Sequence, residues 1–127
     1  MTRQRRYRLG DLQLSILKAL WTAGPGSVAA VRKALGRRRL AYTTVATVLR
    51  RMESDGLVRH ESKGRRFIYR AAVSPEEVTG GMVDDVLQRV FEGSLADMVC
   101  HLLARGEVDP QELARLERLI AERKKEP

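Results

Sequence analysis

Residues 40–55 read Leu-Ala-Tyr-Thr-Thr-Val-Ala-Thr-Val-Leu-Arg-Arg-Met-Glu-Ser-Asp, and Gly56 closes the stretch. Apolar side chains recur here at the spacing of one helix face, which would contain Val45, Val48, Leu49 and Met52. The opposite face would carry hydroxyl and guanidinium groups and no carboxylate before Glu53. Because an ordinary solvated face mixes acidic with basic residues, the stretch is predicted to be an amphipathic helix with a specialised polar face.

The polar face of this predicted helix has the chemistry that the major groove of DNA can use. Hydroxyl groups bond phosphates or base edges, and an arginine can bind guanine through two hydrogen bonds. A core helix with a merely basic solvent face is the alternative interpretation. On the first interpretation, the residues expected to contact DNA are Tyr42, Thr43, Thr44, Ala46, Thr47, Arg50 and Arg51.

The hydrophobic period changes after Gly56 from helical to alternating. Residues 57–62 and 65–70 are predicted to form two antiparallel strands around Lys63-Gly64, where the glycine can supply a positive φ. A hairpin with a cationic tip, placed after a helix-turn-helix, is typical of the wing of a winged helix. Such a wing holds the DNA backbone beside the groove that the helix enters. Its expected contacts are Lys63, Arg65 and Arg66.

Two helices are predicted upstream. Residues 9–23 form the first and end at Gly24-Pro25-Gly26, and Ser27 caps a second helix over residues 28–35. Two arginine clusters flank them. We expect both clusters to lie beside phosphates. The alternative for Arg37, Arg38 and Arg39 is a solvated loop, and the alternative for Arg5, Arg6 and Arg8 is a solubilising tail.

The net charge of +8 is distributed unevenly along the chain. Residues 1–72 hold 17 Lys+Arg against 4 Asp+Glu, a net charge of +13, whereas residues 73–127 hold 7 against 12, a net charge of −5. The basic half suits a polyanion, which could be DNA, RNA or an anionic membrane. A membrane is the least favoured of these, because no basic amphipathic helix with a broad aromatic face is evident.

The single cysteine and the hydropathy pattern bear on location. One cysteine allows no internal disulfide. No window is apolar enough to span a membrane, and the apolar stretch after the basic N-terminus carries Asp11, Gln13 and Lys18, unlike a signal peptide. A cytoplasmic location is therefore expected.

Three short amphipathic helices are predicted after Ser74, where Ser74-Pro75-Glu76-Glu77 is a strong helix start. About 50 residues of this kind make a poor core alone, so their apolar faces need a partner. A second copy of the chain is the simplest one, and packing against the wing domain is the alternative. The residues expected at the dimer interface are Val83, Val86, Leu87, Val90, Phe91, Leu95, Met98, Val99, Leu102, Leu103, Leu113, Leu116 and Ile120.

These patterns predict a mostly α fold with a small two- or three-stranded antiparallel wing. The expected organisation is a flexible basic arm over residues 1–8, a winged helix-turn-helix DNA-binding domain over 9–73, and a C-terminal three-helix dimerisation region over 74–127. Gly80-Gly81 interrupts the first helix of that region and marks either a hinge or a close crossing.

Catalytic and metal chemistry are not expected. Cys100 and His101 are neighbours on a predicted helix and point about 100° apart, so they do not converge on one ion. Asp84-Asp85 is interpreted as a solvated helix face rather than an acid–base pair. We predict that the chain is not an enzyme and binds no metal or cofactor.

The motifs between residues 9 and 120 together resemble one known family. The most specific is Ala41-Tyr42-Thr43-Thr44-Val45-Ala46-Thr47-Val48-Leu49, followed by Arg51-Met52 and Gly56-Leu57. Others are Leu9-Gly10-Asp11-Leu12, Leu20-Trp21, Gly24-Pro25, Lys63-Gly64-Arg65, Phe67-Ile68-Tyr69, Val90-Phe91-Glu92-Gly93-Ser94 and Asp109-Pro110-Gln111-Glu112-Leu113. This pattern resembles the penicillinase repressor (BlaI/MecI/CopY) family of winged-helix transcriptional repressors.

The resemblance implies a homodimer that binds a palindromic operator in double-stranded DNA and keeps downstream genes off. In antibiotic-resistance members, a membrane sensor protease triggers cleavage of an Asn-Phe bond in the dimerisation segment. The equivalent pair here is His101-Leu102, which departs from that pattern. Copper-responsive members carry a cysteine cluster, whereas this chain has only Cys100. Proteolysis, a ligand and a metal thus stay open as releasing signals, and a protein- or RNA-binding module without an operator is the alternative function.

Overall fold

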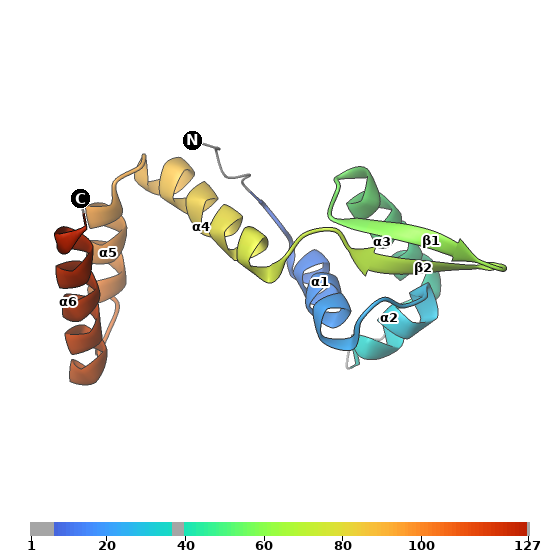
Figure 1. Ribbon diagram of the computed structural model, residues 1–127, viewed down its shortest axis with the longest axis horizontal. Coiled ribbons are helices and arrows are strands. Elements are labelled where there is room, and N and C mark those ends of the chain that lie inside the picture. The colour runs from blue at the N-terminus through green and yellow to red at the C-terminus, as the bar shows by residue number, and fades with distance from the viewer. Residues whose placement is uncertain (1–6, 37–39, 127) are drawn as a thin grey trace. The chain divides into compact units, whose positions relative to one another are not determined.

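The structure, a computed structural model, describes residues 7–36 and 40–126 of the 127-residue chain. The elements are α1 (Asp11–Ala23), α2 (Val28–Ala34), α3 (Tyr42–Ser54), β1 (Val58–Lys63), β2 (Arg66–Ala71), α4 (Pro75–Phe91), α5 (Leu95–Leu103) and α6 (Pro110–Lys125) (Figure 1). The predicted fold class is confirmed: the described residues form helices and one two-stranded antiparallel sheet.

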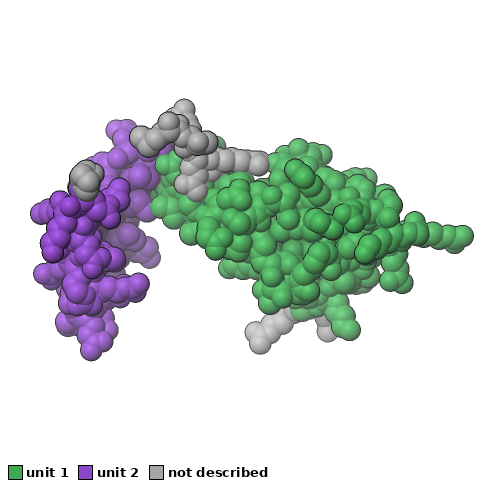
Figure 2. All heavy atoms as spheres, in the orientation of Figure 1, with its two compact units in different colours: residues 1–86 green, residues 87–127 purple. Residues whose placement is uncertain are grey.

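The chain divides into two compact units, residues 1–86 and 87–127 (Figure 2). The division falls inside α4 because the first turns of this helix belong to the core of the first unit, where Val78 is fully buried. The boundary predicted between a DNA-binding domain and a dimerisation region, at residues 73 and 74, concerns function and stays a prediction.

The core of the first unit joins α1, α2, α3, the hairpin and the start of α4. The apolar stripe predicted for residues 40–55 faces inward as expected, with Val45, Leu49 and Met52 buried and Val48 half-buried. The largest fully buried side chains are Ile16, Leu17, Leu49, Met52, Leu57, Val45, Val58 and Val78. This core fixes the direction in which the opposite face of α3 points.

The hairpin pairs β1 with β2 in a register that runs from Val58↔Ala71 at its base to Lys63↔Arg66 at its tip. The turn is therefore Gly64-Arg65, one residue later than the predicted Lys63-Gly64. Gly64 has φ +63°, and glycine at the first position of a two-residue loop is what a type II′ hairpin requires. A single bridge between Gly26 and Tyr69 adds a third backbone segment beside β2.

The N-terminal segment differs from the predicted flexible arm at its last two residues. Tyr7 is buried in the core, and its N–H donates to the carbonyl of Gly81 at 3.3 Å. Arg8 Nε lies 3.1 Å from Asp85 Oδ1, and the Asp85 side chain is only 4% exposed. Asp85 is therefore buried and not solvated, contrary to the prediction. The buried Tyr7 side chain and the Arg8–Asp85 ion pair hold the N-terminal segment on α4.

Side-chain caps begin several of the helices, among them the one predicted at Ser74. Ser74 and Glu77 form a capping box at α4, with the Ser74 N–H donating to Glu77 Oε1 at 3.2 Å and the Glu77 N–H donating to Ser74 Oγ at 3.1 Å. Ser94 Oγ accepts from the Asp97 N–H at α5. Asp109 Oδ1 accepts from the Gln111 N–H at α6. Each bond satisfies a helix donor that has no intrahelical partner.

Replacing Ser74 by alanine is expected to lower the free energy of unfolding by about 1 kcal/mol, because a Glu77 backbone donor loses its partner. Urea denaturation measures this change. Ser74→Gly is the matched control and should cost only a few tenths of a kcal/mol, since glycine also suits the capping position. Equal losses in the two variants would argue against a capping role for the hydroxyl.

Candidate nucleic-acid interface

The outer face of α3 is open to solvent. Tyr42, Thr43, Thr44, Thr47, Arg50 and Arg51 are exposed, and Ala46 is half-buried. Successive helix residues lie about 100° apart, so Thr43, Thr47 and Arg50 point most directly away from the buried stripe. Arg51 and Thr44 lie on one flank of that line, and Tyr42 and Ala46 lie on the flank that faces the hairpin.

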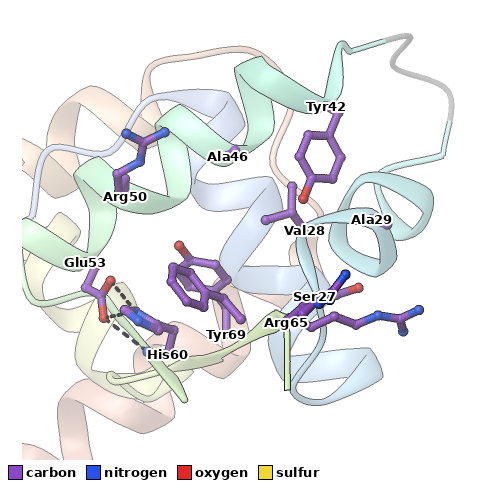
Figure 3. A pocket seen from close by; sticks show the side chains of 12 residues that line it. Ser27, Val28, Ala29, Tyr42, Ala46, Arg50, Glu53, His60, Arg65 and Tyr69 are labelled. Carbon is purple, nitrogen blue, oxygen red and sulfur yellow. Dashed lines mark hydrogen bonds and ion pairs between the residues drawn. The ribbon is translucent and has the colours of Figure 1, made fainter. Parts of the chain in front are cut away.

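A groove of about 690 Å³ separates α3 from the hairpin. Figure 3 shows Tyr42, Arg50 and Arg65 around it, with Tyr69 at its centre. The full lining is Ser27, Val28, Ala29, Tyr42, Ala46, Arg50, Glu53, His60, Arg65, Arg66, Phe67 and Tyr69. The groove thus combines aromatic surface with three guanidinium groups, a composition suited to a nucleic-acid backbone or base.

The hairpin supplies two of the cations that line the groove, Arg65 and Arg66. These two side chains and Lys63 at the tip are exposed, and their contacts with a DNA backbone stay a prediction. Phe67 is 49% exposed, a large fraction for a phenyl ring. Together with the outer face of α3, these side chains form one continuous polar and aromatic surface within the first unit.

An ion pair between Glu53 and His60 crosses from α3 to β1. His60 Nδ1 lies 2.7 Å from Glu53 Oε1 and 2.8 Å from Oε2, and the His60 backbone N–H donates to Oε2 at 3.1 Å (Figure 3). The imidazole stacks on Phe67 with ring centroids 4.2 Å apart. This pair was not predicted from the sequence, although the alternation of β1 places His60 on the same face as its cross-strand neighbour Tyr69.

Tyr69 lies at the floor of the groove with its side chain buried. Burial raises the pKa of the Tyr69 hydroxyl, and the negative charge of Glu53 raises it further, while Arg50 acts in the opposite direction. A tyrosine hydroxyl is already protonated at neutral pH at its ordinary pKa, and the raised pKa of Tyr69 favours that form further, so the hydroxyl is a hydrogen-bond donor.

Of the arginines predicted to contact DNA from the N-terminal arm and from residues 37–39, the structure describes Arg8. Arg5, Arg6, Arg37, Arg38 and Arg39 lie outside the described residues. Arg8 pairs with the buried Asp85 while 69% of its side chain stays exposed. This contact supports a role for Arg8 in holding the N-terminal segment on α4.

The second unit presents an exposed apolar surface. No residue of Leu95–Leu103 or Pro110–Lys125 is buried. Of the side chains predicted at a dimer interface, Val86, Leu87, Phe91, Met98, Val99 and Leu116 are half-buried, and Val83, Val90, Leu95, Leu102, Leu103, Leu113 and Ile120 are exposed. Leu119, which was not among the predicted residues, is also 50% exposed on α6. Exposed apolar side chains in such number are typical of an interaction surface.

Within residues 7–36 and 40–126, no group of three or more His, Cys, Asp or Glu side chains is placed to hold a metal ion. No described helix is both long enough and apolar enough to cross a membrane.

Comparison with known proteins gives a consistent result. Residues 9–122 match the penicillinase repressor family. The transcriptional regulator BlaI of Mycobacterium tuberculosis is 37% identical over 118 residues, which cover 91% of this chain and 84% of that protein. The penicillinase repressor of Bacillus licheniformis is 25% identical over 118 residues, which cover 92% of each protein.

A solved structure is also similar in fold. The solution structure of Bacillus licheniformis BlaI, in its monomeric form in complex with the blaP half-operator, has a TM-score of 0.50 and 22% sequence identity, and the match covers 59% of this chain and 93% of that chain. The family consists of transcriptional regulators, in agreement with the prediction that the chain is not an enzyme. The chain belongs to the penicillinase repressor family, as its sequence motifs predict.

Proposed function

We propose that this protein is a homodimeric transcriptional repressor that binds a palindromic operator in double-stranded DNA and keeps downstream genes off until a signal releases it. One observation carries the proposal: the outer face of α3 is exposed, bears threonines and arginines, and lies beside a cationic hairpin. Membership of a repressor family supports the same function.

The surface divides into two roles. The residues that point most directly outward, Thr43, Thr47 and Arg50, are assigned to base edges in the major groove, because an arginine there can donate two hydrogen bonds to guanine. Lys63 at the hairpin tip is assigned to phosphates, where a flexible ammonium acts as a point charge. The first group would give specificity, and the second would give affinity without sequence preference.

The apolar side chains of the second unit support dimerisation. Leu95 and Leu102 are 64% and 55% exposed, which is costly for a chain that remains alone in water. A second copy would cover such a surface under two-fold symmetry. Two identical DNA-binding heads then match a palindromic site, whose half-sites are related by the same symmetry.

Release from the operator is where this chain departs from the antibiotic-resistance members. His101 and Leu102, at the position of the cleaved pair, are both exposed inside helix α5. A protease binds an extended segment, so cleavage here would require α5 to unfold locally first. A sensor protease remains a proposed partner on the strength of the family resemblance alone.

The test of the proposed function is selective binding. The full-length protein is mixed with genomic fragments and with random duplex at near-physiological salt, and the bound fragments are sequenced and titrated. We expect an inverted repeat that binds at least ~10³-fold more tightly than random duplex. Little or no separation would favour the alternative, a winged-helix module that holds a protein or RNA.

Replacing Lys63 by alanine should weaken binding to every duplex by a similar factor. Loss of one phosphate contact per protomer should also reduce the slope of log affinity against log salt by about one unit per protomer. Titrations at several salt concentrations measure both effects. Lys124→Ala removes the same charge from α6 and should leave the slope unchanged. A change of sequence preference in Lys63→Ala would contradict the backbone assignment.

A further inference from the structure

Glu53 is the only carboxylate of α3, Tyr42–Ser54, and it lies on the wall of the groove that faces the hairpin. Arg50, Arg65 and Arg66 line the same groove. A phosphate backbone entering there is attracted by the arginines and repelled by Glu53. This charge disfavours DNA unless a neighbouring group offsets it.

His60 is placed to offset that charge. Its Nδ1 lies within 2.8 Å of both carboxylate oxygens of Glu53, and its backbone N–H donates to one of them. The Glu53 and His60 side chains are 29% and 30% exposed, so the pair is partly shielded from water. Phe67 stacks on one face of the imidazole and Tyr69 contacts it at a centroid distance of 5.5 Å. The contact therefore fixes β1 against the last turn of α3.

We infer that His60 is a positioning residue that aligns the wing with α3, and that DNA binding is coupled to protonation of the His60–Glu53 pair. The inference rests on the proposed DNA-binding function and adds a pH dependence to it. If Glu53 only accepted the hydrogen bond of the His60 backbone, the wing would still be aligned with α3, but DNA binding would not depend on protonation.

The hydrogen-bond geometry identifies the atom that gains the proton. Since a carboxylate only accepts hydrogen bonds, Nδ1 of His60 carries a hydrogen in both charge states, and the additional proton of the imidazolium is on Nε2. The charged or titratable groups that line the same groove as His60 are Tyr42, Arg50 and Glu53 from α3, Arg65 from the turn, and Arg66 and Tyr69 from β2. Glu61 and Arg70 on the same strands pair with each other at 2.9 Å.

The sign of the effect follows from the charges. With His60 protonated the pair has no net charge, and with His60 neutral the pair carries one negative charge that faces the phosphates. DNA affinity should therefore be higher with His60 protonated than with His60 neutral, and so fall as the pH rises. One unit charge near the phosphates, partly screened by salt, corresponds to roughly a three- to tenfold change in affinity per protomer.

The experiment titrates a 30-base-pair random duplex at low salt and the selected inverted repeat at near-physiological salt, between pH 6.0 and 8.5 at fixed ionic strength. The wild type should weaken roughly three- to tenfold per protomer over this range. Glu53→Gln removes the negative charge and should bind more tightly than the wild type at pH 8.5, but it should still weaken as the pH rises, because His60 still changes by one unit charge. His60→Gln should be insensitive to pH and weak at every pH. His101→Gln is the matched control and should follow the wild type, since His101 is the other histidine of the chain.

Calorimetry of the wild-type protein in two buffers of different ionisation enthalpy measures the number of protons taken up on DNA binding. This measurement does not depend on whether a variant folds correctly. Uptake of protons on binding is expected near neutral pH. A pH-independent affinity of the wild type without proton uptake would overturn the inference alone, as would a wild-type pH response in His60→Gln. Failure to bind any duplex, even at low salt, would overturn the proposed function and this inference together.

Discussion

Replacement of Arg50 by alanine is expected to remove most of the preference for the operator while leaving binding to random duplex nearly intact. Arg50 lies on the outward line of α3 and borders the groove beside the wing. An arginine that donates two hydrogen bonds to a guanine contributes ~1–3 kcal/mol of discrimination, and a dimer uses it twice. We therefore expect a loss of about 2–6 kcal/mol in the operator-to-random ratio, measured by titrating both duplexes at the same salt concentration.

Two further variants separate base recognition from charge at this position. Arg50→Lys keeps the positive charge but loses the planar fork, so it should lose specificity almost as fully as alanine while binding random duplex like the wild type. Arg51→Ala removes an equally exposed arginine about 100° away on the same helix. It should weaken operator and random duplex by similar factors. If Arg50→Lys kept the full operator preference, a phosphate contact rather than a base contact would be indicated.

Replacement of Leu102 by glutamate should convert the dimer into a monomer. Leu102 is 55% exposed in α5, so the substitution disturbs little in a single chain, but a carboxylate buried without a partner between two copies costs about 3 kcal/mol or more. The dimer dissociation constant should rise by roughly 150-fold or more, as measured by analytical ultracentrifugation. The affinity of the variant for the operator should be ~10²–10⁴-fold lower than that of the wild type, because the DNA-binding units of two protomers no longer bind as parts of one molecule.

The control for this variant lies on the same helix. Cys100→Glu introduces the same charge two residues away, about 200° around α5, at a position that is also exposed. It should leave both the dimer and operator binding close to those of the wild type. A monomeric Cys100→Glu together with a dimeric Leu102→Glu would place the interface on a different face of α5.

The sequence predicts the helices of the first unit well because local signals and the core agree. The stripe of Val45, Leu49 and Met52 and the capping box at Ser74 are local patterns, and tertiary packing reinforces them. The hairpin turn was predicted one residue early. Gly64 occupies the first loop position rather than the second, a difference that residue preferences alone do not resolve.

The features that the sequence did not reveal depend on contacts between distant residues. Asp85 was expected in solvent, yet it is buried because Arg8, 77 residues away, pairs with it. Tyr7 likewise becomes part of the core through a segment without hydrophobic periodicity. Within the candidate interface, the arginines and threonines follow from helical spacing. The Glu53–His60 pair required knowledge of how β1 folds back toward α3.

In the proposed complex, the outer faces of two α3 helices contact base edges in the major groove of a palindromic site. Methylation interference at guanine N7 on the selected inverted repeat measures this directly, because N7 lies in the major groove and accepts hydrogen bonds from arginine. We predict two symmetric clusters of interfering guanines, with centres one helical turn or a small multiple of it apart, and loss of these clusters in Arg50→Ala. A tightly bound duplex without interference at any guanine N7, or with a single cluster, would contradict the account.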